Sequence, residues 1–189
     1  AVKGVVKIVP LDTTYGHGFG VIAENTWAAF RAADLIEADW GKPDFPADGA
    51  AVNEALNAAL ATDGSRLRDD GDVDVAFADA PADSVLEAEY AVPFLAHICM
   101  EPMNATARFK DGKLELWAPN QMPTLVEYLS GAAIGLESAN VTAHTTSLGG
   151  GFGRREADTT IYAAIMAKEV EGRPVKVIWS REEDVRHDS

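Results

Sequence analysis

The chain has 189 residues, of which 47% are hydrophobic and 24% are charged, as is typical of a globular protein of one or two domains. Its formal net charge of −14 argues against nucleic acid as a partner, because phosphate binding requires the opposite sign. No apolar run comes near the roughly 18 residues of a membrane-spanning helix, so we expect no membrane span. The single cysteine, Cys99, excludes an intrachain disulfide and any metal site built from cysteines of this chain, and we expect it to be a buried small hydrophobic residue.

The first third of the chain predicts two strands followed by two helices. β-Branched residues mark the strands, and apolar residues at helical spacing mark the helices. Asn25 or Thr26 is expected to cap the first helix. The elements expected here are a strand over 2–9, a polar loop over 12–18, a strand over 20–23, a helix over 27–39 and a helix over 50–61.

The next segment is strongly acidic. Residues 37–89 hold 14 acidic and three basic side chains. This composition predicts a solvated acidic surface, and the alternative is a docking surface for a basic partner. A short β-like piece is expected at 73–76. The change of composition at 81–84 predicts a boundary between one domain over 1–83 and a second over 84–189.

The second half shows stronger signals for regular structure. Alternating apolar and acidic residues predict a half-buried strand over 85–92, and Asp111-Gly112 predicts a hairpin turn. Asn120 is expected to cap a helix with Pro123 in its first turn. The remaining elements are hairpin strands at 108–109 and 114–118, the capped helix to about 133, a strand over 141–146, a helix over 157–170 and a strand over 175–180. The predicted class is α+β, a mixed α/β fold in two parts.

A glycine loop, SLGGGFGRRE over 147–156, joins the strand over 141–146 to the helix that follows. Glycine allows the backbone to approach a ligand closely, and a helix start offers unpaired N–H donors. The loop can therefore cradle an anionic or polar cofactor; the alternative is a tight turn without a ligand. It lacks both the G-x-G-x-x-G spacing of dinucleotide folds and the Gly-Lys-Ser/Thr of P-loops. Phe152, inside the glycines, needs a flat or apolar surface to pack on.

Two other places carry polar side chains of interest. His97 and Glu101 supply too few ligands for a metal, and Pro102 argues against one continuous helical face, so we expect no metal site. A hydrogen bond between His97 and Glu101 that supports a turn is the expected role. The amide of Gln121 can donate and accept toward a ligand held over the glycine loop, and the alternative is an ordinary surface glutamine.

Taken together, motifs in a fixed order across residues 85–188 resemble the molybdopterin-binding subunit of the xanthine dehydrogenase and aldehyde oxidase family. Arg154-Arg155 and His187-Asp188 resemble most the isoquinoline 1-oxidoreductase β-subunit branch. Residues 21–29 resemble the end of that family's α/β hammerhead domain. The motifs are His97-x-x-Met100-Glu101-Pro102, Ala107, Asp111-Gly-x-Leu-x-Leu-Trp117, Gln121-x-Pro123, Leu148-Gly-Gly-Gly-Phe-Gly153, Gly172-Arg-Pro-Val175 and Ser180-Arg-Glu-Glu-Asp184.

The resemblance implies a hammerhead piece with an acidic insertion, followed by the first part of a molybdopterin-binding α+β domain. It also implies a molybdenum hydroxylase that inserts water-derived oxygen with the help of a glutamate base. Gln121 matches the family's glutamine beside the molybdenum oxo group, and Phe152 and Gly153 match residues on the apical side of the metal. Gly150, Gly151 and Arg154 complete the candidate cofactor-binding set. The double arginine replaces a Gly-Lys of better-known members, which changes the charge at the cofactor.

Further expectations come from the same resemblance. The glutamate base is expected outside this chain, so no catalytic residue is assigned within it. The chain is expected to be a piece of a longer subunit, inactive and without cofactor by itself. The expected cofactor is molybdopterin in its cytosine dinucleotide form, and the expected partners are a small [2Fe-2S] subunit, the remainder of the same subunit and an aldehyde or N-heterocycle. The branch implies a periplasmic location, with the cytoplasm as the alternative. The competing hypothesis is a complete, acidic binding or interaction module without cofactor.

Overall fold

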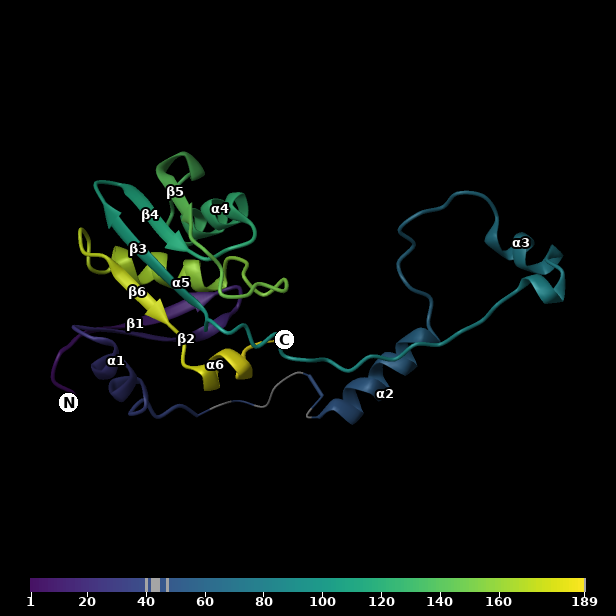
Figure 1. The fold of residues 1–189 in the computed structure, drawn as a ribbon, viewed down its shortest axis with the longest axis horizontal. Helices are drawn as coiled ribbons and strands as arrows, with labels where there is room; N and C mark the ends of the chain where they lie inside the picture. The colour runs from purple at the N-terminus through teal and green to yellow at the C-terminus, as the bar shows by residue number, and fades with distance from the viewer. Residues whose placement is uncertain (40, 42–44, 47, 189) are drawn as a thin grey trace. The chain divides into compact units, whose positions relative to one another are not determined.

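The computed structural model describes residues 1–39, 41, 45–46 and 48–188 (Figure 1). The chain divides into two compact units: the first joins residues 1–38 to residues 96–189, and the second is residues 39–95. The boundary expected after residue 83 lies inside the second unit. The division into domains over 1–83 and 84–189 therefore stays a prediction.

A four-stranded sheet forms one side of the first unit, in the order β5-β4-β3-β6. β3 pairs with β4 and β6 in antiparallel fashion, and β4 pairs with β5 in parallel. Asp111 and Gly112 have φ angles of 51° and 71°, as a tight hairpin turn requires, so the predicted β3–β4 hairpin is confirmed. The strands are β3 at Asn104–Lys110, β4 at Lys113–Ala118, β5 at Val141–Thr145 and β6 at Val175–Ile178.

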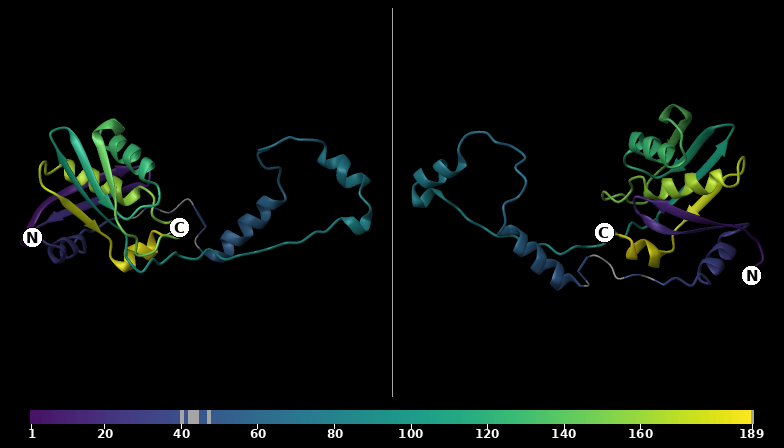
Figure 2. Two further views of the ribbon diagram at one scale, coloured as in Figure 1. Left: turned by 45° about the horizontal axis from the view of Figure 1, so that its top comes forward. Right: turned by 180° about the vertical axis from the view of Figure 1, so that it is seen from behind.

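Two helices cover one face of this sheet. α4, Pro123–Ala133, begins with proline in its first turn, as predicted, but its N-cap is Met122 and not Asn120. The Asn120 side chain is instead buried and donates to the Ala118 carbonyl and to Thr145 Oγ1, both at 3.1 Å, because the chain must first leave the end of β4. α5, Asp158–Lys168, lies between the sheet and an N-terminal hairpin (Figure 2).

The N-terminal hairpin consists of β1, Val5–Thr13, and β2, Gly16–Ala23. Its antiparallel pairing continues to Thr13 and Gly16, so most of the loop predicted over 12–18 is strand. The predicted loop is wrong because polar residues are also tolerated in strands at the exposed end of a hairpin. α1, Thr26–Ala33, is shorter than the predicted helix, and the Asn25 side chain caps it by accepting from Ala28 N at 2.9 Å.

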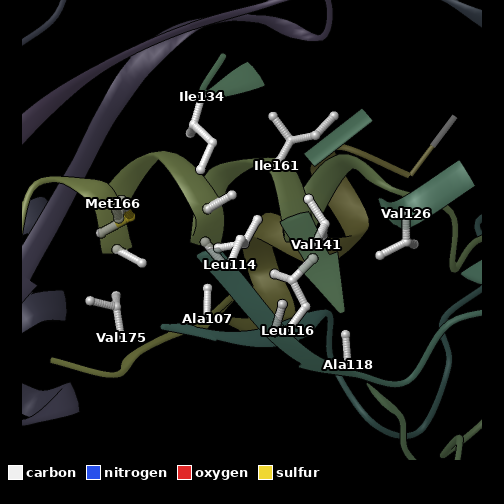
Figure 3. Packing of buried hydrophobic residues seen from close by; sticks show 14 of the residues in the cluster. Ala107, Leu114, Leu116, Ala118, Val126, Ile134, Val141, Ile161, Met166 and Val175 are labelled. Atoms are coloured by element: carbon white, nitrogen blue, oxygen red, sulfur yellow. The ribbon is translucent and has the colours of Figure 1, made fainter. Parts of the chain in front are cut away.

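The core of the first unit is where sheet, helices and N-terminal hairpin meet (Figure 3). Leu114 and Leu116 of β4 point into it together with Val126 of α4, and all three are almost fully buried. Small side chains on α5 allow close packing on both of its sides, because alanine brings helix and sheet backbones together. The fully buried alanines on or next to this helix are Ala157, Ala163, Ala164 and Ala167.

The second unit has no core in the part of it that the structure describes: none of its residues is buried. It holds α2, Gly49–Leu60, then α3, Val73–Asp79, and a 3-10 turn, Ala82–Ser84. The β-like piece predicted at 73–76 is wrong, because the Asp72 side chain caps a helix there by accepting from Val75 N at 3.0 Å.

The strand predicted over 85–92 is also wrong. These residues belong to no helix, strand or sheet, and Leu86, Tyr90 and Val92 are exposed. Alternating apolar residues form a half-buried strand only where a neighbouring strand and a core receive them. Two short elements complete the first unit, a 3-10 turn at Ser138–Asn140 and α6 at Arg181–Arg186.

The α+β class predicted from the sequence is confirmed by this arrangement of helices and sheets. Among the residues described, no helix has the length and apolar character needed to cross a membrane.

Candidate cofactor site

The glycine loop lies between β5 and α5 in a conformation that is costly for most residues. Gly150 and Gly153 have φ angles of 105° and 94°, and Phe152 has a φ of 53°. A non-glycine residue in this left-handed region costs on the order of 1 kcal/mol or more and persists only where its surroundings hold it. The Phe152 side chain is nevertheless 73% exposed, so packing of its ring does not supply the restraint.

Glu101 holds the start of the loop. Its Oε2 accepts from Gly149 N at 3.0 Å, and its own backbone N donates to the Gly149 carbonyl at 3.1 Å. A Cβ at position 149 would overlap the Glu101 Cβ, so only glycine permits this approach. The pKa of Glu101 would be raised by burial, but hydrogen bonds from Asn104 and Gly149 and the charge of Arg155 bring it below its usual value.

Arg155 holds the loop from within. It is fully buried, its Nε donates to the Gly150 carbonyl at 2.6 Å, and its Nη2 donates to the Glu101 carbonyl. The same Nη2 lies 3.1 Å from Glu101 Oε2. The second arginine of the loop therefore directs its charge into the protein, to Glu101.

Gln121 holds the far end of the loop. Its Oε1 accepts from Gly153 N at 3.1 Å and from Arg155 N at 3.3 Å, and its backbone N donates to the Arg155 carbonyl at 2.9 Å. A Cβ at Gly151 would come within 2.9 Å of the Gln121 amide. The structure thus brings Gln121 together with four predicted site residues, Gly150, Gly151, Phe152 and Gly153; their binding of a cofactor stays a prediction.

Arg154, the last member of the predicted set, is used inside the protein. Its Nη1 donates to Asp158 at 2.9 Å, its Nε lies 3.2 Å from Asp188 Oδ1, and its guanidinium lies 5.7 Å from the centre of the Trp179 ring. Burial alone would lower the pKa of Arg154, but Asp158 and the other carboxylates raise it. Its side chain links the start of α5 to the C-terminal segment, and its proposed contact with a cofactor stays a prediction.

His97 does not pair with Glu101, and that prediction is wrong. Its Nδ1 lies 2.7 Å from Asp188 Oδ1, while the backbone N–H groups of His97 and Ile98 donate to Asp188 Oδ2. Ile98 has a φ of 42°, which interrupts any regular helical spacing between positions 97 and 101. Burial alone would raise the pKa of Asp188, but the hydrogen bonds from His97 and Ile98 lower it.

The segment 97–101 packs against the glycine loop. Cys99 is buried, as predicted, and its Sγ lies 3.6 Å from the Gly151 carbonyl. Arg181 donates to the carbonyls of Cys99 and Met100. Sequence reasoning named Arg181 and Asp188 only as parts of motifs and missed their contacts, together with the inward role of Arg155, since no local pattern connects residues so far apart along the chain.

A shallow hollow adjoins Gln121. It is lined by Gln121 and residues 122–125 together with Tyr128, and its surface is mostly apolar. No group of three or more His, Cys, Asp or Glu side chains in the described ranges is arranged to hold a metal ion. A ligand in this hollow would meet the Gln121 amide and mostly apolar surface.

Comparison with known proteins identifies the family. The profile described as "Molybdopterin cofactor-binding domain" matches residues 57–189. The chain belongs to the molybdopterin cofactor-binding domain family. Its sequence is 32% identical over 200 residues to the membrane-bound aldehyde dehydrogenase [pyrroloquinoline-quinone] of Gluconacetobacter polyoxogenes, covering 100% of this chain and 25% of that protein.

A second relative is the isoquinoline 1-oxidoreductase subunit beta of Brevundimonas diminuta, 28% identical over 199 residues, with 98% of this chain and 24% of that protein covered. The structure of quinoline 2-oxidoreductase from Pseudomonas putida 86 has the same fold, with a TM-score of 0.68 at 19% identity over 97% of this chain and 28% of that one. The resemblance predicted from the motifs is thus confirmed. This molybdopterin-domain chain spans about a quarter of the length of these relatives.

The glycine loop fits a cofactor of the kind named by the family. The hydrogen bonds within the described residues leave the backbone N–H groups of Gly150, Gly151 and Phe152 without a protein acceptor. The Nε2 of Gln121 likewise has no protein acceptor there, and Gln121 is exposed. Pterin ring oxygens, phosphates and metal-bound oxygens all accept hydrogen bonds, so this set of donors matches the group chemically.

Proposed function

We propose that this chain is the part of a molybdenum hydroxylase subunit that supplies the cofactor loop. The parent enzyme would oxidise aldehydes or N-heterocycles with oxygen derived from water. The observation that carries the proposal is the row of N–H donors at Gly150–Phe152, without a protein acceptor among the described residues, beside the Gln121 amide and the buried Arg155 that hold the loop. Relatives named aldehyde oxidase and isoquinoline 1-oxidoreductase support this choice of substrates.

When bound, the molybdopterin centre would supply the oxygen transfer and accept the two electrons removed from the substrate. Gln121 and the loop amides would orient that centre by donating hydrogen bonds to its oxygen atoms. Neutral donors suit this task because they stabilise developing negative charge without competing as metal ligands; removing one such donor typically costs about 3 kcal/mol in a transition state. Phe152, exposed at the tip of the loop, would shield the same space from water.

Several finer points belong to the same proposal. The cofactor would be the cytosine dinucleotide form, and the glutamate base would come from outside this chain. A small [2Fe-2S] subunit would carry the electrons away, and the remainder of the same subunit would complete the pocket. We also propose a periplasmic location, on the resemblance to the isoquinoline 1-oxidoreductase branch.

The test is molybdenum content by elemental analysis of the longer protein, produced with its maturation machinery. We expect about one molybdenum per polypeptide, and a large loss of molybdenum or of turnover in a Gln121→Ala, Phe152→Ala double variant. Phe77→Ala is the matched control, because Phe77 is a similarly exposed phenylalanine on α3. A folded longer protein without molybdenum would contradict the hydroxylase proposal and favour the alternative, an acidic binding module without cofactor.

A further inference from the structure

We propose that Glu101 and Arg155 are positioning residues whose ion pair sets the shape of the glycine loop before any cofactor binds. The inference rests on the proposed function for its purpose, but its geometry is independent of the cofactor. Arg155 Nη2 lies 3.1 Å from Glu101 Oε2, and Arg155 belongs to the loop itself whereas Glu101 lies in the segment 97–101 that contacts it.

The first step of the argument is the burial of Arg155. Its side chain is fully buried, and a buried guanidinium is strongly destabilising unless a carboxylate and hydrogen-bond acceptors compensate it. The compensation comes from Glu101 and from the carbonyls of Gly150 and Glu101 through Nε and Nη2, while Nη1 is buried without a hydrogen-bond partner among the described residues. The same guanidinium group therefore forms the ion pair with Glu101 and holds the Gly150 carbonyl in place.

The second step is what Glu101 does in return. Its Oε2, which lies near Arg155, also accepts from Gly149 N. The pair thus fixes two peptide groups of the loop, one through the N–H of Gly149 and one through the carbonyl of Gly150, with the Gly149–Gly150 peptide between them. Together with Gln121 at Gly153, it holds the loop on both sides of the free N–H groups.

The third step concerns strain. The left-handed φ of Phe152 would relax in an unrestrained loop, and relaxation would change the orientation of the peptide groups on either side of Phe152. Preorganised donors are worth more than flexible ones because no reorganisation is required when charge develops. The ion pair therefore acts on the ligand through the loop, without touching it.

The shape of the arginine matters as well as its charge. The guanidinium donates through Nε to Gly150 and through Nη2 to Glu101, and a lysine ammonium cannot reproduce this planar fork. Arg155→Lys is therefore expected to keep the buried charge but to release the Gly150 carbonyl.

The experiment compares Glu101→Gln and Arg155→Lys with a matched control, Glu115→Gln, in the longer protein prepared without cofactor. Glu115 forms an ion pair with Arg108 across β3 and β4, and its side chain is 35% exposed against 36% for Glu101. The readouts are hydrogen–deuterium exchange of the peptide 147–156 and the ¹⁹F resonance of 4-fluorophenylalanine placed at position 152. Exchange of α5 and thermal unfolding report whether each variant is folded.

We expect exchange of residues 147–156 to rise about tenfold in Glu101→Gln, since one charged hydrogen bond is lost. The ¹⁹F resonance should shift and broaden in both site variants but not in Glu115→Gln. Unchanged loop exchange and an unchanged resonance in folded Glu101→Gln would overturn the inference, as would an equal change in the control. If Arg155→Lys does not fold, loop exchange and the ¹⁹F resonance of Glu101→Gln alone test the inference.

A second readout, in protein matured with cofactor, separates this inference from the proposed function. Molybdenum content should fall about tenfold in Glu101→Gln if the loop loses its preorganised form, and remain unchanged in Glu115→Gln. If the unvaried protein holds no molybdenum, the hydroxylase proposal fails, while the exchange and ¹⁹F results still decide whether Glu101 and Arg155 position the loop.

Discussion

The two compact units differ in how far they bury the same kind of side chain, leucine. In residues 1–38 and 96–189, leucines such as Leu114 and Leu116 are buried between sheet and helices. In residues 39–95, Leu67 and Leu86 are more than 90% exposed. Both regions contain apolar residues and capped helices, so neither the presence of apolar residues nor helix capping separates them. The difference shows that elements become a core only where at least two layers bury a shared face.

The largest contrast should appear on truncating a leucine in each unit. Leu116→Ala removes a fully buried side chain and should destabilise the fold by about 3 kcal/mol, because a cavity remains. Leu67→Ala should change stability by less than about 0.5 kcal/mol, since Leu67 is 98% exposed. Urea-induced unfolding of the chain, followed by tryptophan fluorescence, measures both. Equal losses would mean that the second unit buries Leu67 in solution.

An intermediate contrast is expected between carboxylates at acidic pH. Asp188 is buried and accepts from two backbone N–H groups, and its pKa is lowered overall, although burial alone would raise it. The unfolded chain therefore takes up this proton first as the pH falls. The stabilisation from Asp188 is complete above roughly pH 4, the ordinary pKa of aspartate, and disappears as the pH drops through the lower pKa of the folded state.

Asp188→Asn should accordingly lower stability by about 2 kcal/mol at pH 7 and flatten the loss of stability below roughly pH 4. Asp70→Asn is the control from the second unit, because the Arg68–Asp70 pair is exposed and such pairs contribute little. Urea unfolding at a series of pH values measures the effect. A profile for Asp188→Asn parallel to that of the unvaried chain would contradict the role assigned to Asp188.

The smallest contrast concerns helix caps. Asn25 accepts from Ala28 N at 2.9 Å at the start of α1, and Asp48 accepts from Ala51 N at 2.8 Å at the start of α2. Asn25→Ala should lower global stability by about 1 kcal/mol, since α1 belongs to the unit with the core. Asp48→Ala should reduce helical circular dichroism slightly and leave the unfolding midpoint unchanged. A shift of that midpoint would show that α2 unfolds cooperatively with the first unit.

The features that could be predicted from the sequence were those with local causes. The Asp111-Gly112 turn fixes the β3–β4 hairpin, and the proline in its first turn marks α4. The glycines of the loop predicted close approach of the backbone to a ligand, which stays a prediction; the structure shows that Gly149 and Gly151 also permit close approach of Glu101 and Gln121. In each case the controlling residues lie within a few positions of the feature itself.

The features that could not be predicted depend on residues distant in sequence. His97 binds Asp188, and Arg155 binds Glu101, and no spacing rule points from one to the other. The alternation over 85–92 predicted a strand, but β structure requires a second strand to complete it. Burial of Arg155 was likewise unpredictable, because arginine is usually exposed unless a specific partner neutralises it.

The position of α5 between sheet and N-terminal hairpin also has a consequence for the time course of folding. Val9 and Ile22 complete the core around a helix that begins only at Asp158, so the hairpin is synthesised well before the helix that it packs against. The intervening residues 39–95 add little to the free-energy cost of bringing the hairpin and α5 together, because closing a loop costs only about 0.6 kcal/mol more for each doubling of its length. Until α5 emerges, the apolar face of the hairpin has no partner within this core, and a nascent chain is most prone to aggregate in that interval.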